Sequence, residues 1–199
     1  MLNAALAIIH DEHRSLVAVV HGLRYLVREM REKGEGPDFK LLWAMIYYID
    51  AFPARMHHPK ENAYLFARLR LRTHEADTVL EELEREHASG ARQVRDLEHA
   101  LGYFEADKPD GFEVFATAVE KFAEEVWQHI SVEEKVIIPL AKKHLTAEDW
   151  VEIAEAFGEN GDPRFGAEPD HEFRDLFSRI VNLAPPPIGV GPPHLTSGG

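Results

Sequence analysis

An apolar stripe with helical spacing runs through the second half of the chain and is interrupted by one histidine and one glutamate. It advances in alternating steps of three and four through Phe112, Phe115, Val119, Phe122, Val126, His129, Glu133, Val136 and Leu140. Steps of this size place the side chains on one face of a helix, which is typical of the inward face in a helical bundle. Because burying an unpaired carboxylate is costly, Glu133 must be paired, protonated or bound to a metal.

Two other segments carry apolar stripes of the same kind, each with one histidine where a leucine would serve. In residues 2–30 only His13 interrupts the apolar positions, and in residues 80–104 the histidine is His87. Both segments are predicted to be long amphipathic helices with these histidines on the inward face.

A further helix is predicted from Phe39 onward, with a kink in the middle. Pro53 and Pro59 interrupt it, because each removes a backbone donor and crowds the carbonyl four residues earlier. Beyond the kink the inward positions are predicted to include His57 and Glu61, which repeat the four-residue spacing of the histidine and glutamate in the last helix. At that spacing both side chains leave the same face and can reach one metal ion.

The positions of the four histidines agree with an up-down-up-down bundle, in which residues equidistant from a loop lie at the same height. The midpoint between His13 and His57 is residue 35, in a loop rich in Gly and Pro. The midpoint between His57 and His87 is residue 72, at a predicted turn, and that between His87 and His129 is residue 108, in the turn DKPDG. The four imidazoles are therefore predicted to meet at one level.

Glu61 and Glu133 lie one helical turn beyond their histidines on two helices that run in the same direction, so both are predicted to lie between two metal positions. Neutral imidazole and carboxylate are ligand types that suit iron and manganese. The predicted metal ligands are His13, His57, Glu61, His87, His129 and Glu133.

Each of these residues, taken alone, has an ordinary structural interpretation. A lone histidine on an apolar face is usually a core residue bonded to a backbone carbonyl, and a lone glutamate is usually paired with Lys or Arg. The matching heights of six such residues favour a metal site instead. His58 points about 100° away from His57 on a regular helix, but the kink can turn it inward. We therefore keep His58 and His10 as candidates outside the ligand set.

Composition narrows the classes of function. The formal net charge of −13 over 199 residues disfavours nucleic-acid binding, which requires clustered Lys and Arg. The absence of cysteine excludes disulfides, thiolate metal sites and Cys nucleophiles, and it agrees with a cytoplasmic location. The N-terminal residues do not resemble a signal peptide, and no window is apolar enough for a membrane span.

The predicted fold class is all-α, an up-down-up-down four-helix bundle with additions at the C-terminus. We assign residues 1–145 to the bundle, 146–183 to two short accessory helices and 184–199 to a flexible tail rich in Pro and Gly. The first accessory helix is predicted to begin with a capping box at Thr146 to Asp149. These helices are expected to cover one flank or end of the bundle.

The stretches IIHDEHRSL, FPARMHHPKENAYLF, LEREH and WQHISVEEKVIIPL together resemble the hemerythrin-like, or HHE cation-binding, domain over about residues 1 to 145. This resemblance implies a non-haem di-iron centre, bridged by carboxylates and by an oxo or hydroxo group, with manganese as the alternative metal. It implies that His13 and His57 bind one iron and that His87 and His129 bind the other. Glu61 and Glu133 would bridge them.

The chain departs from the oxygen-carrying hemerythrins at two places. Ala91 stands where those proteins have a second histidine on the third helix, and Glu133 stands one residue before their aspartate. The set of four His and two Glu is more similar to the domain of iron-centre repair proteins, which act in nitrosative and oxidative stress but carry an additional segment with cysteine. Open coordination positions would suit dioxygen, nitric oxide or peroxide as small ligands.

Three functions stay open from the sequence. The leading one is a di-iron protein that binds dioxygen, nitric oxide or peroxide, or holds labile iron, in sensing or a stress response. The second is a redox enzyme of the peroxidase or oxidase type, although no separate substrate pocket or nucleophile is evident. The third is a metal-free helical module that recruits a protein partner.

Overall fold

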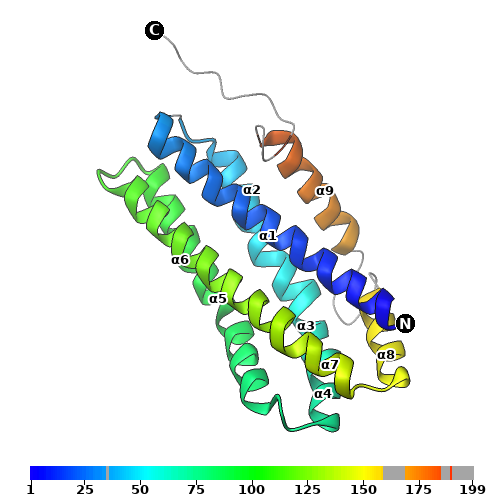
Figure 1. The fold of residues 1–199 in the computed structure, drawn as a ribbon. Coiled ribbons are helices and arrows are strands. Elements are labelled where there is room, and N and C mark those ends of the chain that lie inside the picture. Colours follow the sequence, from blue (N-terminus) through cyan, green and yellow to red (C-terminus); the bar gives the residue numbers. More distant parts are fainter. Residues whose placement is uncertain (35, 159–168, 185–188, 190–199) are drawn as a thin grey trace.

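The computed structural model describes residues 1–34, 36–158, 169–184 and 189, with side chains omitted for residues 169–174. All regular secondary structure in these ranges is helical, which confirms the predicted all-α class. Four long helical rods form the bundle, and two shorter helices lie against it (Figure 1). The first rod is α1 (Leu2–Lys33) and the third is α5 (Asp77–Glu105).

The second and fourth rods combine α-helix with π-helical turns, in which the backbone hydrogen bond spans five residues rather than four. The segments of the second rod are α2 (Phe39–Phe52), η1 (Pro53–His57), α3 (His58–Lys60), η2 (Glu61–Phe66) and α4 (Ala67–Arg72). Those of the fourth rod are α6 (Gly111–Val132), η3 (Glu133–Ile137) and α7 (Ile138–His144). Neighbours in sequence pack side by side, and α1 also packs on α6, so the bundle closes.

The loops are short and their ends are fixed by local chemistry. Gly34 adopts a left-handed conformation (φ 65°) after α1, and its N–H bonds to the carbonyl of Met30. Asp38 caps α2 by accepting a hydrogen bond from the N–H of Leu41 at 3.0 Å. At Gly111 a Cβ atom would lie 2.8 Å from the Cα of Phe104, so glycine allows the close approach of α5 and α6.

α5 begins with Ala76 at the cap position, and the Thr73 hydroxyl in the preceding turn accepts from the N–H of Glu75. The structure corrects one detail of the stripe predicted from the sequence. In the fourth rod the regular stripe ends at Glu133, because η3 inserts an extra residue into the turn. Ile137 is therefore fully buried, whereas Val136 is only half-buried.

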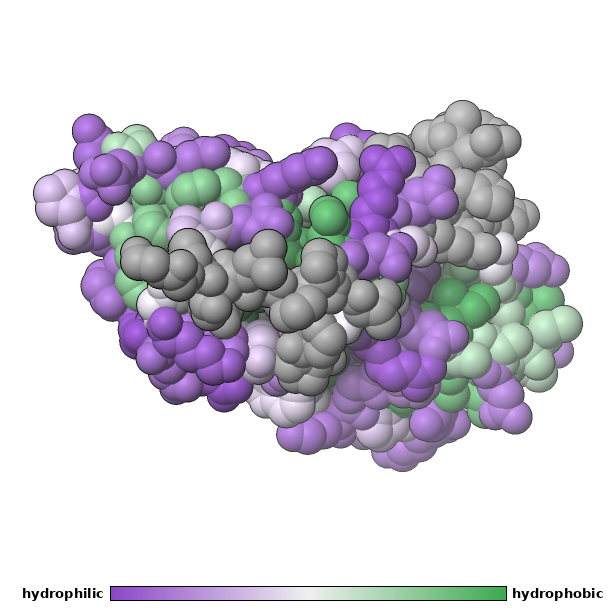
Figure 2. Space-filling view, turned by 90° about the horizontal axis from the view of Figure 1, so that it is seen from above, coloured by the Kyte–Doolittle hydropathy of each residue, from purple (hydrophilic) through white to green (hydrophobic). Residues whose placement is uncertain are grey.

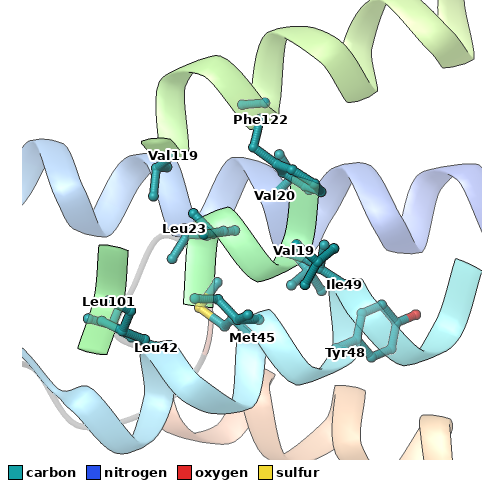
Figure 3. Packing of buried hydrophobic residues seen from close by; sticks show 14 of the residues in the cluster. Val19, Val20, Leu23, Leu42, Met45, Tyr48, Ile49, Leu101, Val119 and Phe122 are labelled. Atoms are coloured by element: carbon teal, nitrogen blue, oxygen red, sulfur yellow. The ribbon is translucent and has the colours of Figure 1, made fainter. Parts of the chain in front are cut away.

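The hydrophobic core is split into two clusters. One is built mainly from the middle of α1 and α6, α2 and the second half of α5, and Figure 3 shows side chains such as Leu23, Met45 and Val119 converging in it. The other joins the start of α1 and α5 to α4, α7 and α8. The predicted ligand residues lie between the two clusters along every rod. The bundle therefore holds a polar layer enclosed by apolar packing.

The two C-terminal helices are α8 (Ala147–Gly158) and α9 (Pro169–Leu183). The predicted capping box is present, since Asp149 accepts from the N–H of Thr146 at 2.9 Å and the Thr146 hydroxyl accepts from the N–H of Asp149. α8 packs on α1 and η2, and α9 packs on α2. Most of the predicted tail, 184–199, lies outside the described residues. The division into 1–145, 146–183 and 184–199 stays a prediction.

Hydrophilic residues spread over the face of the molecule shown in Figure 2, with hydrophobic residues between them. Within the described ranges, no helix combines the length and the apolar character required to span a lipid bilayer.

Candidate metal centre

The six residues predicted as ligands come together in the polar layer. Their imidazole and carboxylate atoms form two groups, in each of which the atoms lie within 4.8 Å of one another. The first group consists of His13, His57, Glu61 and Glu133, and the second of Glu61, His87, His129 and Glu133. The two glutamates belong to both groups, as the sequence analysis expected of bridging residues.

Each glutamate turns one carboxylate oxygen toward a histidine of the first group and the other oxygen toward a histidine of the second group. Oε1 of Glu61 lies 3.3 Å from Nε2 of His57, while its Oε2 lies 3.5 Å from Nε2 of His87. Oε2 of Glu133 lies 3.3 Å from Nε2 of His13, while its Oε1 lies 3.2 Å from Nε2 of His129. This is the orientation that two carboxylates need to bridge a pair of metal ions.

The histidines present Nε2 to the centre because Nδ1 of each is held from behind. On the side of the first group, Nδ1 of His13 donates to Glu134 at 2.8 Å, and Nδ1 of His57 donates to Glu12 at 2.8 Å. A neutral imidazole with its proton on Nδ1 leaves a lone pair on Nε2. Such an acceptor behind the ring fixes both the tautomer and the orientation of a metal-binding histidine.

The second group shows the same arrangement. Nδ1 of His87 donates to Oδ1 of Asn62 at 2.8 Å, and Nδ1 of His129 donates to Glu86 at 2.6 Å. The Nε2 atoms of His87 and His129 face each other at 3.1 Å. All four predicted histidines therefore bond through Nδ1 to side chains and not to backbone carbonyls, with Nε2 directed at the glutamates.

The centre also contains buried polar atoms that have no hydrogen-bond partner among the described residues. They are both carboxylate oxygens of Glu61, both of Glu133, and Nε2 of His13. Glu61 and Glu133 are at most 1 % exposed, so solvent cannot satisfy these atoms. Orphaned carboxylate oxygens are costly in a protein interior, and a metal ion between the two groups would satisfy them. The donor set thus fits a metal cation.

Without a metal, charge pairing within the centre shifts the pKa values strongly. Burial disfavours the charged form of His13, but the carboxylates of Glu133 and Glu134 beside its two ring nitrogens outweigh it and raise the pKa of His13 to about 12. Burial opposes charge on His57 and His129 as well. The charge of Glu61 nevertheless raises the pKa of His57 to about 9, and the charge of Glu133 raises that of His129 to about 9. Protons therefore occupy positions that a metal would have to take over.

The two glutamates stay ionised in this environment. Burial and the charge of Glu133 both favour protonation of Glu61, but His57 and His13 outweigh them and hold the pKa of Glu61 at about 2. Burial also acts on Glu133, and His129 and His13 nevertheless lower its pKa well below the usual range. Two ionised carboxylates are thus available to bind cations.

The ligand set predicted from the sequence leaves out His58, which forms a third group with His87 and His129 in the structure. Its ring nitrogen lies within 4.8 Å of those of His87 and His129, and its ring stacks on His87 with centroids 3.9 Å apart. Burial and the neighbouring charges of His87 and His57 lower the pKa of His58 to about 2, so its imidazole is neutral. His58 can therefore contribute a third nitrogen to this group.

His58 faces inward because the wider π-helical turn in η1 rotates the residues that follow it about the helix axis. Pro59 lacks an N–H and its ring crowds the carbonyl four residues earlier, which a widened turn relieves. Pro139 follows η3 in the same way that Pro59 follows η1. A proline directly after a His-His pair was therefore the signal in the sequence that could have identified His58.

His10, the other candidate kept outside the ligand set, lies at the edge of the centre. Its Nδ1 donates to Glu134 at 2.8 Å, the same carboxylate that His13 uses. It belongs to neither group of clustered ligand atoms.

The two groups differ in their surroundings. Next to the first group, Phe157 of α8 is fully buried, with its ring centroid 6.5 Å from that of His57. Next to the second group, a cavity of about 260 Å³ is lined by His58, His87 and His129 among others. Ala91, where oxygen carriers would have a further histidine, also lines this cavity. Phe157 therefore covers His57 of the first group, whereas the cavity reaches the three histidines beside the second group.

Comparison with protein families identifies this arrangement. The family described as hemerythrin HHE cation binding domain matches residues 4–141, which is most of the chain and includes every residue of both groups. The chain belongs to the hemerythrin HHE cation-binding domain family. It is accordingly a cation-binding domain with a His and Glu cluster able to hold a metal. A comparison with curated proteins finds no match.

The hemerythrin domain ends before α8 and α9 begin. The closure of the first group by Phe157 therefore comes from a part of the chain that lies beyond the matched domain.

Proposed function

We propose that this hemerythrin-domain chain is a non-haem di-iron protein that binds dioxygen, nitric oxide or peroxide, or holds labile iron, in sensing or a stress response. The observation that carries the proposal is the pair of buried glutamates, whose oxygens lack hydrogen bonds and are divided between two clusters of Nε2 atoms. Imidazole and carboxylate donors suit iron, with manganese as the alternative.

In this proposal the two metal positions have different ligands. His13 and His57 hold the first, and His58, His87 and His129 hold the second. Glu61 and Glu133 bridge the two positions and neutralise part of their charge. Iron in such a site supplies redox chemistry and binding positions for small ligands.

The role of the surrounding residues is to orient the ligands and to exclude water from one side. Glu12, Glu86, Asn62 and Glu134 hold the imidazoles with Nε2 inward. Phe157 covers His57 at the first position, and the cavity beside His58, His87 and His129 gives a small ligand a route to the second position. The proposal includes neither nucleic acid nor membrane as a partner, in view of the net charge of −13, and it places the protein in the cytoplasm.

Metal analysis together with the optical spectrum tests the proposal. Protein reconstituted anaerobically with ferrous iron at neutral pH should retain about two irons per chain after desalting, as di-iron bundles do. Oxidation should produce charge-transfer absorption in the near ultraviolet, and nitric oxide or peroxide should change that spectrum. Retention of no iron, or a spectrum that neither ligand alters, would contradict the proposal.

A second candidate, a redox enzyme of the oxidase or peroxidase type, is favoured by one observation. The cavity beside His58 is far larger than a diatomic ligand needs. Steady-state consumption of peroxide with an organic reductant, lost in His129→Ala, would support an enzyme. A reaction that stops after one equivalent per centre would argue for binding or sensing instead.

A further inference from the structure

The cavity beside the second metal position is too large to serve only small diatomic ligands. Its volume is about 260 Å³, whereas a water molecule occupies roughly 30 Å³ in the liquid and a cavity of about 150 Å³ accepts benzene. Space for an aromatic ring and several further atoms therefore lies directly against the imidazoles of His58, His87 and His129.

The walls of the cavity are suited to an apolar body. Leu16 comes from α1, Ile49 from α2, Val94 from α5, and Phe122 and Val126 from α6. Four rods thus contribute to one surface, and each of these side chains also belongs to the larger hydrophobic cluster or packs against it. Burial of apolar atoms against such a surface is favourable.

Apart from its imidazoles, the charged side chains of the cavity are acidic. Asp50, Glu86 and Glu125 line it, and none of the described lining residues is Lys or Arg. Glu86 and Glu125 have side chains that are 41 % and 36 % exposed, whereas that of His87 at the other end is 3 % exposed. The cavity therefore leads from carboxylates near the solvent to the buried imidazoles.

These carboxylates differ in their partners. That of Glu86 accepts a hydrogen bond from His129 at 2.6 Å and is therefore already paired. Lys121 lies 3.9 Å from Glu125 at the surface, a kind of pair that contributes little. Asp50 is half-buried on α2 and lines the cavity. Asp50 and Glu125 thus leave negative charge in the cleft, which concentrates ligands of the opposite sign.

We infer that this cavity binds a small organic cation, an ammonium compound with an aromatic or branched aliphatic body. Its apolar part lies on Phe122, Val94 and Ile49 and faces the imidazoles. Its positive end lies near Glu125 and Asp50. The inference deepens the proposed function, on which it rests for the metal at His58, His87 and His129, by naming the class of organic molecule that reaches the centre.

Matched probes test the inference on the iron-loaded full chain and on the metal-free chain. Benzyltrimethylammonium carries the charge and cannot bind iron through nitrogen. Benzyl alcohol is the neutral counterpart and benzenesulfonate the anionic one. Calorimetric titration at low salt should show the cation binding about tenfold more tightly than the alcohol, a difference of one decade in Kd, and no measurable binding of the sulfonate. Added salt should reduce the preference for the cation.

Two glycine substitutions on α5 provide a matched pair. Gly90 lines the cavity, and a Cβ added there meets no atom within 4 Å, so Gly90→Leu is expected to fill the space without disturbing the fold. Gly102 has equally open surroundings but does not line the cavity. Leucine has the higher helix propensity at either site. Gly90→Leu should weaken cation binding at least about tenfold, and Gly102→Leu should leave it unchanged.

The outcomes separate the inference from the proposed function. Equal or tighter binding of the alcohol or the sulfonate, no binding of the cation, or the same loss in both glycine variants overturns the inference, whatever the iron content. Failure to retain iron overturns the proposed function, and titration of the metal-free chain then still decides whether the cavity selects a cation.

Discussion

At the scale of single residues, the centre depends on contacts that fix each histidine ring through both of its nitrogens. Every predicted histidine has an acceptor behind Nδ1 and a glutamate oxygen in front of Nε2, so its position is defined from both sides. His58 differs, because its ring is placed by stacking on His87 and by the turn that precedes it. The contribution of His58 is therefore the sharpest question at this scale.

Replacing His58 by alanine is expected to weaken the second metal position and to leave the first intact. Loss of one nitrogen donor should lower the iron affinity of that position by at least about tenfold, because even the loss of a residue that only orients a metal ligand lowers affinity by that factor. Equilibrium dialysis against iron should show one tight and one weakened site per chain. His99→Ala, at an exposed position on α5, is the control. Two unchanged sites in His58→Ala would remove His58 from the ligand set.

At the scale of secondary-structure elements, the π-helical turns and α8 shape the centre. Glu61 and Glu133 are each the first residue of a π-helical segment, η2 and η3. Such turns are frequent at functional sites, since they redirect side chains that a regular helix would place elsewhere. α8 completes the enclosure, and its own start is fixed by Asp149, whose carboxylate accepts from Arg72 at 2.8 and 3.0 Å.

The charge of Asp149 should stabilise the attachment of α8. Its hydrogen bonds with Arg72 outweigh burial and lower its pKa from 3.8 to about 2. A lowered carboxyl pKa stabilises the fold above the unfolded-state pKa, and this contribution is lost as the pH falls through the folded-state value. Asp149→Asn should therefore lower the free energy of unfolding by about 1 kcal/mol at neutral pH, as loss of a helix cap does.

Urea unfolding at several pH values measures this difference. It should be constant above about pH 4 and shrink as the pH falls toward 2, where wild-type Asp149 becomes protonated. Glu155→Gln, at an exposed position on the same helix, should change little. A difference between wild type and Asp149→Asn that persists unchanged at pH 2 would show that the charge is not responsible.

Phe157 of α8 is expected both to stabilise the fold and to protect the first metal position. Phe157→Ala should lower the free energy of unfolding by about 3–5 kcal/mol, because the ring is fully buried. The resulting space beside His57 should also speed the loss of iron to an external chelator. Phe112→Ala, in the half-buried shell of the other cluster, is the control. Equal rates of iron loss in the two variants would argue against protection by α8.

At the scale of the whole molecule, the bundle tolerates a charged layer between two hydrophobic clusters because charges of opposite sign meet there. Without a metal, protonated histidines balance Glu61 and Glu133. With a metal, the ion takes over this role and the histidines must be neutral. Folding, protonation and metal binding are therefore linked through the same residues.

This linkage predicts how the effect of metal removal depends on pH. A raised histidine pKa stabilises the metal-free fold below the unfolded-state value of 6.5, and this contribution is lost as His57 and His129 deprotonate near 9. Metal binding instead strengthens as protons leave. The difference in Tm between iron-loaded and chelator-treated protein should widen from pH 6.5 to pH 9.

Thermal melts of iron-loaded protein in excess ferrous iron, and of the same protein with chelator, check this prediction. At free metal about a hundredfold above Kd the stabilisation should be about 2.7 kcal/mol. Glu133→Gln removes the charge of a proposed ligand and should reduce the response to chelator. Identical melts with and without chelator at both pH values would instead favour the metal-free interaction module.

The sequence by itself determined the helical class, the loop positions and the level at which six polar residues meet. These follow from local rules, since spacing by three and four sets the face of a helix and short loops set the relative heights of antiparallel rods. The convergence of His13, His57, Glu61, His87, His129 and Glu133 was therefore predictable without knowledge of packing. Where a kink at Pro53 and Pro59 was predicted, the second rod contains the π-helical segments η1 and η2.

Only the tertiary structure decided which further residues join the centre. Glu12, Glu134 and Glu86 reach their histidines from other helices, and such contacts depend on the rotation of each rod about its axis. The π-helical turns set that rotation, which brings His58 inward and shifts the buried positions after Glu133. The closure by α8 and the cavity beside Ala91 likewise arise from packing between segments distant in sequence, for which local spacing carries no information.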